Sequence, residues 1–411
     1  STQTFTYDNS KPASVATYPS DDAFFSTAPL RIAGTALDDI AGGVSLVKVY
    51  IWEDRNNNNI KNEGGGPTDD RWWNGSTWTT TETDIGVNAS PDAGSPQLWE
   101  VTTNLPLANH LTNWAGVNTR RYRIYTRARD SATNDEDITS PPADVSFRYD
   151  NVPPSMGTVL PVAAYYNGLP TLSGTAQDSL NVSTVQVRIY SFSNNDYWTG
   201  AGWGGASTEW KQAVGSTNTS VQVTWTYNSP ADWTTGGSQF TVEARGFDYA
   251  GNTTTLAGIT FNYDNNRPTS TVTYPSANDL RFSSMTTLFG RALDPGTTSQ
   301  SSGIKTVKIK IKRSQDNYFW NPTGGGGSGA FDTTSDPGFT LSPTVNLYTT
   351  SATWSYTHAE FSNSNAWLPS GQTFYIYTQT EDNSRYTDYS SMTLTELTTS
   401  TRTFIFDNVA P

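Results

Sequence analysis

The sequence predicts an all-β protein of three tandem β-sandwich domains, and two observations lead to this prediction. A signature of an aromatic residue, Asp, Asn and then Pro three residues on occurs four times, at Tyr7–Pro12, Tyr149–Pro154, Tyr263–Pro268 and Phe406–Pro411. Such a repeat marks joints between like modules. Between the joints, short runs of alternating apolar and polar residues are separated by polar turns, which is typical of strands. The 411 residues give each module enough chain for its own core.

The first two predicted strands of each module end in recognisable residues. An edge strand ends at Tyr18-Pro19, Leu160-Pro161 or Tyr274-Pro275, where Pro is tolerated because an edge N–H needs no partner. The next strand carries a Gly followed four residues later by an Asp, in the pairs Gly34/Asp38, Gly174/Asp178 and Gly290/Asp294.

The later strands repeat equally well. A third strand alternates through Val47/Val49/Ile51, Val185/Val187/Ile189 or Val307/Ile309/Ile311, which predicts one buried and one wet face. A strand anchored by Trp99, Trp225 or Trp354 follows, then a strand that ends at Asp130, Asp248 or Asp382, and a closing strand that enters the next joint. About seven strands per module favour an immunoglobulin-like sandwich without its Cys pair.

The joints divide the chain into predicted units. Residues 1–9 are the end of a preceding repeat and a linker, 10–151, 152–265 and 266–408 are the three Ig-like domains, and 409–411 begin the next linker. Since only about five residues separate a closing strand from the next module, we expect an end-to-end rod. Thr4–Tyr7 matches the closing strands, so we expect it to be a strand whose own module is missing. Such a segment is either disordered or leans on the first module, or it pairs with a neighbouring subunit and drives polymerisation.

These segments resemble the tandem Ig-like domains of large bacterial cell-surface and adhesin-type proteins. The resemblance depends on the Gly-Thr-Ala-x-Asp segment, the turns Arg127–Asn134 and Arg245–Asn252, and the joints. The third module departs from it, with Thr380–Ser384 where the second has Gly246–Asn252. The resemblance implies a non-enzymatic, extracellular stalk or adhesin segment whose partners are neighbouring repeats, like subunits, or surface glycans and proteins.

Composition excludes several classes of function. A net charge of −13 repels nucleic acid and anionic membranes and favours cations. The sequence contains no cysteine, which excludes disulfides and thiolate chemistry. No run approaches the ~20 apolar residues of a membrane span. Catalysis has little support, because His110 and His358 lie in different modules and the Gly runs lack the Lys of a phosphate loop.

The joints are candidate calcium sites. In an Ig-like sandwich, the entering chain, the turn after the second strand and the turn before the last strand meet at one pole, so three Asp-bearing segments converge there. Carboxylate, amide and backbone oxygens suit Ca²⁺. The alternative is that each Asp or Asn only makes a local turn. The predicted ligands are Asp8, Asn9, Asp38 and Asp130; Asp150, Asn151, Asp178 and Asp248; Asp264, Asn265, Asp294 and Asp382.

A second calcium candidate is the loop from Asp54 to Ile60. Its Asp-x-Asn-x-Asn start matches the first ligand positions of a calcium loop, but Asn59 replaces the required Gly. A solvated, Asn-rich hairpin tip is the alternative, in which a change at Asp54 would matter little.

Aromatic residues cluster after the third strand of every module. Exposed indole rings can stack on sugars, so Trp73, Trp78, Trp198, Trp203 and Trp320 are candidate glycan contacts. The alternative is a hairpin that folds its Trp over the core. Three functional hypotheses therefore stand: a stalk or adhesin segment stiffened by calcium, a carbohydrate-binding array appended to a larger protein, and a self-assembling extracellular filament or surface-layer subunit.

Overall fold

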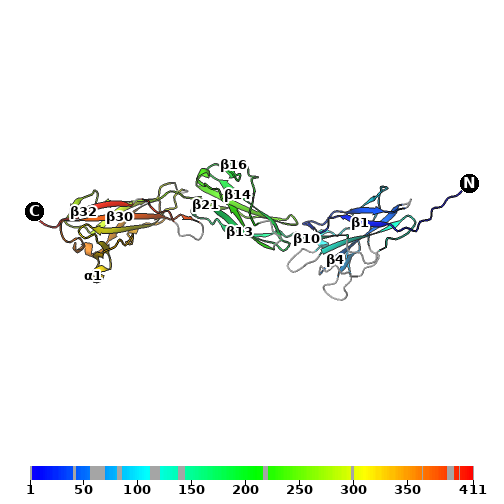
Figure 1. Ribbon diagram of the computed structural model, residues 1–411, viewed down its shortest axis with the longest axis horizontal. Coiled ribbons are helices and arrows are strands. Elements are labelled where there is room, and N and C mark those ends of the chain that lie inside the picture. The colour runs from blue at the N-terminus through cyan, green and yellow to red at the C-terminus, as the bar shows by residue number, and fades with distance from the viewer. Residues whose placement is uncertain are drawn as a thin grey trace.

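The protein is an end-to-end row of β-sandwiches. The computed structural model describes residues 2–39, 43–55, 70–80, 86–111, 121–137, 144–215, 221–297, 300–362, 364–386, 393–397 and 399–410. Figure 1 shows three sandwiches one after another, with the two termini at opposite ends. Each sandwich has its own large hydrophobic cluster, and these lie within 16–149, 160–261 and 272–406. The all-β prediction and the rod arrangement are confirmed, whereas the domain boundaries drawn from the joints remain predictions.

In the first sandwich, a small sheet packs against a larger one. The small sheet has the order β1 (Ala13–Tyr18), β3 (Ile32–Leu37), β8 (Gln97–Val101). The larger sheet has the order β2 (Ala23–Phe25), β10 (Val145–Tyr149), β9 (Arg121–Asp130), β4 (Val44–Asp54), β5 (Arg71–Trp73), β6 (Trp78–Thr79), with β7 (Val87–Ala89) paired to β4. A short helical turn, η1, spans Ala108–His110.

The second sandwich repeats this arrangement. Its small sheet has the order β11 (Ser155–Leu160), β13 (Thr171–Gln177), β18 (Gln222–Asn228). Its larger sheet has the order β16 (Trp203–Gly205), β15 (Asp196–Trp198), β14 (Val182–Ser191), β19 (Gln239–Asp248), β21 (Ile259–Tyr263), β12 (Tyr165–Gly168), with β17 (Lys211–Gln212) on β14 and β20 (Thr253–Thr255) on β19. The turn η2 spans Thr234–Gly236.

The third sandwich adds short helical segments. Its small sheet has the order β22 (Thr269–Tyr274), β24 (Thr287–Leu293), β29 (Ser351–Thr357), β28 (Thr344–Val345). Its larger sheet has the order β23 (Leu280–Phe282), β32 (Ser400–Phe406), β30 (Gln372–Asp382), β25 (Ile304–Arg313), β26 (Phe319–Asn321), β27 (Ala330–Thr333). The helical segments are α1 (Gly324–Gly327), α2 (Ala359–Ser362) and η3 (Asn365–Trp367), and β31 (Arg385–Tyr386) pairs outside this sandwich.

The repeated Gly and Trp explain each other. Trp99, Trp225 and Trp354 are buried on the third strand of the small sheet. Each lies directly opposite a Gly of the neighbouring strand, in the pairs Gly34/Trp99, Gly174/Trp225 and Gly290/Trp354. A Cβ at any of these glycines would overlap the indole ring and a backbone oxygen of the neighbouring strand β1, β11 or β22. The Gly therefore gives the indole ring its place in the core.

One strand prediction is wrong. The predicted wet face of the third strand is not wet in the first sandwich, because Tyr50 and Trp52 of β4 are covered by Trp72 and Tyr125 in a second, small aromatic cluster. The segment Thr4–Tyr7, expected to lack its own module, pairs with no strand of the described chain, and the side chain of Phe5 is 92% exposed.

One strand in every sandwich was not predicted from the sequence. The short strands β2, β12 and β23 each run parallel to the closing strand, as β2 with β10, β12 with β21 and β23 with β32. We refer to β2, β12 and β23 as the edge strands. Each has too few residues to show an alternating pattern.

Candidate metal centres at the joints

Three groups of three aspartates lie at corresponding places in the three sandwiches. Within each group, the carboxylates offer one oxygen apiece, and these oxygens all lie within 4.8 Å of one another. The groups are the first joint group (Asp8, Asp38, Asp130), the middle joint group (Asp150, Asp178, Asp248) and the third joint group (Asp264, Asp294, Asp382). The predicted convergence of Asp-bearing segments at one pole is therefore present at every joint.

Three different parts of the chain supply each group. The second aspartate directly follows β3, β13 or β24, and the third aspartate is the last residue of β9, β19 or β30. In the middle and third joint groups, the first aspartate follows the closing strand of the preceding sandwich, and its backbone is bonded to that sandwich. The N–H of Asp150 donates to the carbonyl of Phe25 in β2 at 2.9 Å, and the N–H of Asp264 donates to the carbonyl of Tyr166 in β12 at 2.8 Å. Asp150 and Asp264 thus each connect two consecutive sandwiches.

In the middle joint group, one side of each carboxylate is held by a backbone N–H. Asp150 Oδ1 accepts from Val152 N at 2.9 Å, and Asp178 Oδ1 accepts from Leu180 N at 2.7 Å. Asn252 serves two members of the group, because its Nδ2 donates to Asp248 Oδ2 and to the backbone carbonyl of Asp150, both at 2.7 Å. These bonds fix the carboxylates in place while leaving other oxygens free to bind a ligand.

The third joint group uses serines in place of the asparagine. Asp294 Oδ2 accepts from Ser301 Oγ at 2.7 Å and from Gly303 N at 2.7 Å. Asp382 Oδ1 accepts from Ser384 Oγ at 2.8 Å. The change follows from the sequence, since the third module has Ser384 where the second module has a longer turn ending in Asn252.

The first joint group is the most open of the three. Asp8 and Asp38 are half-buried, whereas Asp130 is buried. Asn134 acts here as Asn252 does in the middle group: its Nδ2 donates to Asp130 Oδ2 at 2.8 Å and to the carbonyl of Asp8 at 3.2 Å.

Electrostatics in all three groups disfavours the ionised state. Burial, together with the charges of Asp178 and Asp248, raises the pKa of Asp150 to about 7. Burial also raises the pKa of Asp382 to about 7 and that of Asp264 to about 6. The pKa values of Asp178, Asp248, Asp294 and Asp38 are raised as well, in each case chiefly by burial. Without a compensating positive charge, these carboxylates repel one another and lack hydration.

Buried carboxylate oxygens in these groups have no hydrogen-bond donor among the described residues. They are Asp38 Oδ2, Asp150 Oδ2, Asp294 Oδ1 and Asp382 Oδ2. Three of the four residues are fully buried, since Asp150, Asp294 and Asp382 are each 0% exposed. An unpartnered buried carboxylate oxygen is costly, and a bound cation would remove that cost.

The turn-making interpretation is correct for the first aspartates but incomplete. Asp8, Asp150 and Asp264 each accept a hydrogen bond from the backbone N–H two residues later. Asp407, in the fourth copy of the signature, makes the same turn with Val409 and pairs with Arg281 at 3.2 Å. A turn uses one carboxylate oxygen, so it does not account for the burial of the other oxygen against two more carboxylates.

The predicted asparagine ligands Asn9, Asn151 and Asn265 are exposed, so their side chains are not buried with the carboxylates. The asparagines whose side chains contact the groups are Asn134 and Asn252, which the sequence had indicated only as parts of turns. The spacing of an Asp and an Asn four residues later would have identified them, because that spacing lets the amide close a turn onto the carboxylate.

The second calcium candidate is not supported by what the structure describes. Residues 56–60 lie outside the described residues. Asp54 is 0% exposed at the end of β4, and its Oδ2 accepts from Arg123 Nε at 2.5 Å. When one partner of a buried ion pair is removed, the other charge is left uncompensated. A substitution of Asp54 should therefore destabilise the protein, contrary to the expectation that it would matter little.

The candidate glycan contacts are parts of the cores. Trp73 and Trp320 are each 2% exposed, so their ring faces are not available to a sugar. Trp78, Trp198 and Trp203 are half-buried and pack against the first and second cores. Trp203, for example, stacks on the buried Phe240 with ring centroids 5.3 Å apart. The hairpin that folds its Trp over the core is the interpretation that fits these positions.

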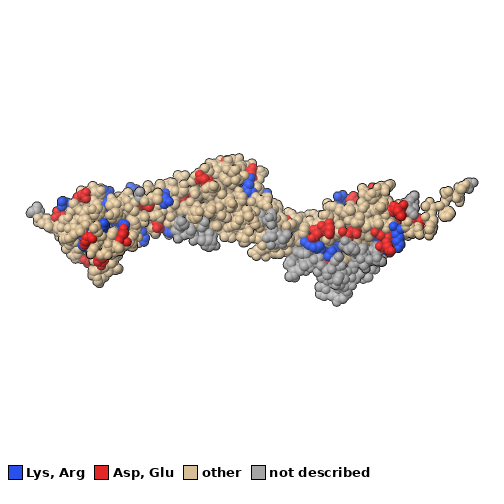
Figure 2. Space-filling model, in the orientation of Figure 1, with Lys and Arg blue, Asp and Glu red and all other residues tan. Residues whose placement is uncertain are grey.

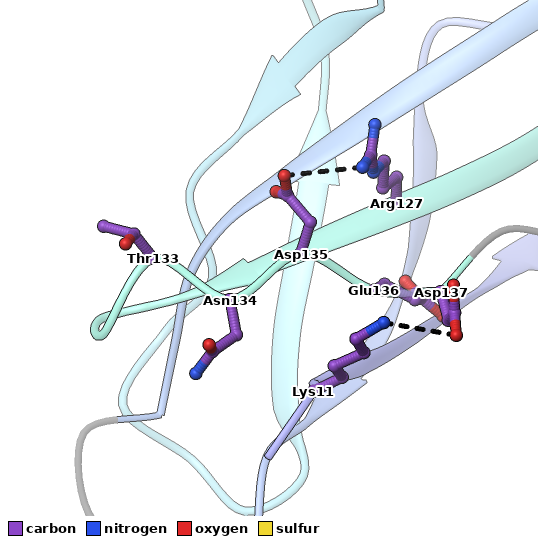
Figure 3. A pocket seen from close by; sticks show the side chains of 7 residues that line it. All are labelled: Lys11, Arg127, Thr133, Asn134, Asp135, Glu136 and Asp137. Carbon is purple, nitrogen blue, oxygen red and sulfur yellow. Dashed lines mark ion pairs between the residues drawn. The ribbon is translucent and has the colours of Figure 1, made fainter. Parts of the chain in front are cut away.

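A surface hollow beside the first joint group is lined by paired charges. Its volume is about 460 Å³. Figure 3 shows Lys11 directed toward Asp137 and Arg127 toward Asp135, with nitrogen–oxygen distances of 3.2 Å and 3.4 Å. These two ion pairs neutralise four of the charged side chains that line the hollow. Figure 2 shows the same pattern more widely, with acidic and basic side chains in small mixed groups.

Comparisons with known proteins find distant structural likenesses. No family model and no curated protein matches the sequence. Solved structures that resemble it include a bacterial ice-binding adhesin of 1.5 MDa (10% identity, 97% of both chains, TM-score 0.29). Others are fibronectin III-like modules of Clostridium thermocellum CbhA (12% identity, 62% of this chain and 94% of that one, TM-score 0.27) and the D00-D0 domain of intimin (8%, 61% and 99%, TM-score 0.24). At these values, nothing about ligands or partners follows. Among the described residues, no helix is both long and apolar enough to cross a membrane.

Proposed function

We propose that this chain is a non-enzymatic, extracellular segment of tandem Ig-like modules that acts as a spacer or adhesin stalk, and that Ca²⁺ bound at the joints stiffens it. The observation that carries the proposal is the composition of the joint groups. In each, three carboxylates from three chain segments meet, and a fully or partly buried oxygen lacks a donor.

The geometry explains why a cation would stiffen the rod. The backbone of Asp150 is bonded to β2 of the first sandwich, and its side chain lies with Asp178 and Asp248 of the second. A cation held by these carboxylates would therefore link both sandwiches through one residue. Ca²⁺ suits the donor set because it takes six to eight oxygen ligands, and backbone carbonyls and water can complete its coordination.

The proposal is tested by solution scattering and calorimetry of the whole chain in calcium and in EDTA. We expect calcium to narrow the range of bend angles and to raise the thermal midpoint. A ligand that binds only the folded state adds about 2.7 kcal/mol per site at 100 times its Kd. Identical scattering and melting in both buffers would show that the aspartates only make turns. Fibres that grow with protein concentration would instead favour a self-assembling subunit.

A further inference from the structure

The two joints between sandwiches are built differently. At the joint between the second and third sandwiches, a strand crosses from one to the other. β31 of the third module pairs in parallel with the edge strand β12 of the second, in the register Tyr166↔Arg385 and Gly168↔Tyr386. Beside this pair, Asn167 Nδ2 donates to Ser384 Oγ at 2.8 Å. We call Asn383–Tyr386 the joint arm.

The edge strand β12 fits the joint arm closely. Gly168 is buried, and a Cβ at this position would overlap the ring of Tyr386. The guanidinium of Arg385 lies over the ring of Tyr166, with Cζ 5.9 Å from the ring centroid. Tyr166 is 0% exposed. The contact therefore combines backbone pairing with a side-chain fit that a glycine makes possible, which is how strand addition obtains both affinity and specificity.

The joint arm begins at the third joint group. It directly follows Asp382, whose Oδ1 accepts from Ser384 Oγ at 2.8 Å and from Leu394 N at 3.1 Å. These two hydrogen bonds, from Ser384 in the arm and from Leu394 further along the chain, fix the base of the arm at Asp382. This is the segment in which the third module departs from the repeated pattern.

The corresponding place at the other joint has no arm. In the second module, Asp248 is followed by a tight turn that Asn252 closes by donating its N–H to Asp248 Oδ1 at 2.8 Å. The turn reaches the edge strand β2 through one ring contact, between Tyr249 and Phe24 with centroids 5.5 Å apart. Across residues 2–39 and 221–297, where both elements are described, no strand of the second sandwich pairs with β2.

We propose that β12 is a docking strand for the joint arm, and that this pairing holds the second and third sandwiches in one orientation without a cation. The orientation of the first and second sandwiches depends instead on the cation in the middle joint group. The second half of this inference rests on the proposed calcium function. The array then has one fixed joint and one joint whose stiffness follows calcium concentration.

Distance distributions between paired labels test this in the whole chain. Because the sequence contains no cysteine, introduced cysteines are the only thiols. Labels at the exposed positions Thr17→Cys and Thr224→Cys report the joint between the first and second sandwiches. Labels at Thr224→Cys and Thr353→Cys report the joint between the second and third sandwiches. Each pair is measured in calcium and in EDTA.

The perturbing variant is Gly168→Ala, which adds a methyl group against Tyr386 at a backbone conformation open to alanine. The matched control is Gly202→Ala in the same sandwich, where an added Cβ has no neighbour within 4 Å. Tyr386→Ala removes the ring from the arm side and leaves β12 unchanged.

We expect EDTA to widen the distance distribution between labels at positions 17 and 224, and to leave the distribution between positions 224 and 353 narrow. Gly168→Ala and Tyr386→Ala should each widen the second distribution, while Gly202→Ala should match the parent chain. Equal widening of both joints by EDTA in the parent chain would overturn the inference and leave the calcium proposal standing. If calcium changes neither joint, the calcium proposal fails. In that case Gly168→Ala alone tests whether the joint arm holds the second and third sandwiches in one orientation. An unchanged distance distribution across that joint in Gly168→Ala would refute this role of the arm.

Discussion

Replacing Asp178 by asparagine would separate its role in a turn from a role as a cation ligand. The amide oxygen of asparagine can still accept the hydrogen bond that Leu180 N donates at 2.7 Å, so the turn is retained. The change removes one negative charge from the middle joint group. We therefore expect opposite effects on stability with and without calcium.

The size of the effect follows from the separation of the carboxylates. Two unit charges at the outer limit of 4.8 Å interact by about 3 kcal/mol at an effective dielectric constant of about 20. Since burial raises the pKa of Asp150 to about 7, partial protonation already relieves some of this repulsion at neutral pH. We expect the free energy of unfolding of Asp178→Asn in EDTA to exceed that of the parent chain by roughly 1–2 kcal/mol.

In calcium the order should reverse. The parent chain gains about 2.7 kcal/mol at 100 times the Kd of the site, whereas the variant loses this gain at the middle joint. Thermal denaturation gives the stabilities, and isothermal titration calorimetry should show one bound calcium fewer. The control is Asp232→Asn, because Asp232 makes the same kind of turn, with Thr234 N at 2.8 Å, outside the joint groups. A variant that is less stable in EDTA and unchanged in its calcium response would refute this reasoning.

Four further predictions concern pH and the core. Because the folded-state pKa of Asp150 lies at about 7, above the ordinary 3.8, the calcium-free protein should lose stability as pH rises between these values. Calcium competes with that proton, so calcium affinity should rise with pH through about 7, and titrations in buffers of different ionisation enthalpy should detect proton release. Gly290→Ala should cost about 1–3 kcal/mol by overlapping Trp354, which urea denaturation against Gly202→Ala will measure. Trp203→Ala should lower stability by about 3–5 kcal/mol, and glycan arrays should show no binding that depends on Trp203.

Local sequence patterns predicted much of the fold. The alternation of Val185, Val187 and Ile189 marks a strand because side chains of a strand point to opposite faces in turn. The recurrence of Gly174 and Asp178 in every module marked the end of the next strand and one member of a joint group. These features were visible because each depends on residues that are close in sequence.

The candidate site was predicted in part. The nine aspartates could be identified because repeats placed them at equivalent ends of strands, and the topology of the sandwich brings those ends to one pole. Asn252 was missed because its contact with Asp150 joins residues far apart in sequence. The glycan contacts were wrong at Trp73 and Trp320, since a run of aromatic residues does not show which ring faces the core.

The sequence by itself determined that this is a row of like β-sandwiches with an acidic cluster at each joint. Only the tertiary structure decided which carboxylate oxygens are buried without donors, and that the segment after Asp382 crosses to the preceding sandwich. The physical reason is the same in both cases. Burial and strand pairing between Gly168 and Tyr386 depend on the packing of two sandwiches, and short segments that pair across a joint have no local pattern of their own.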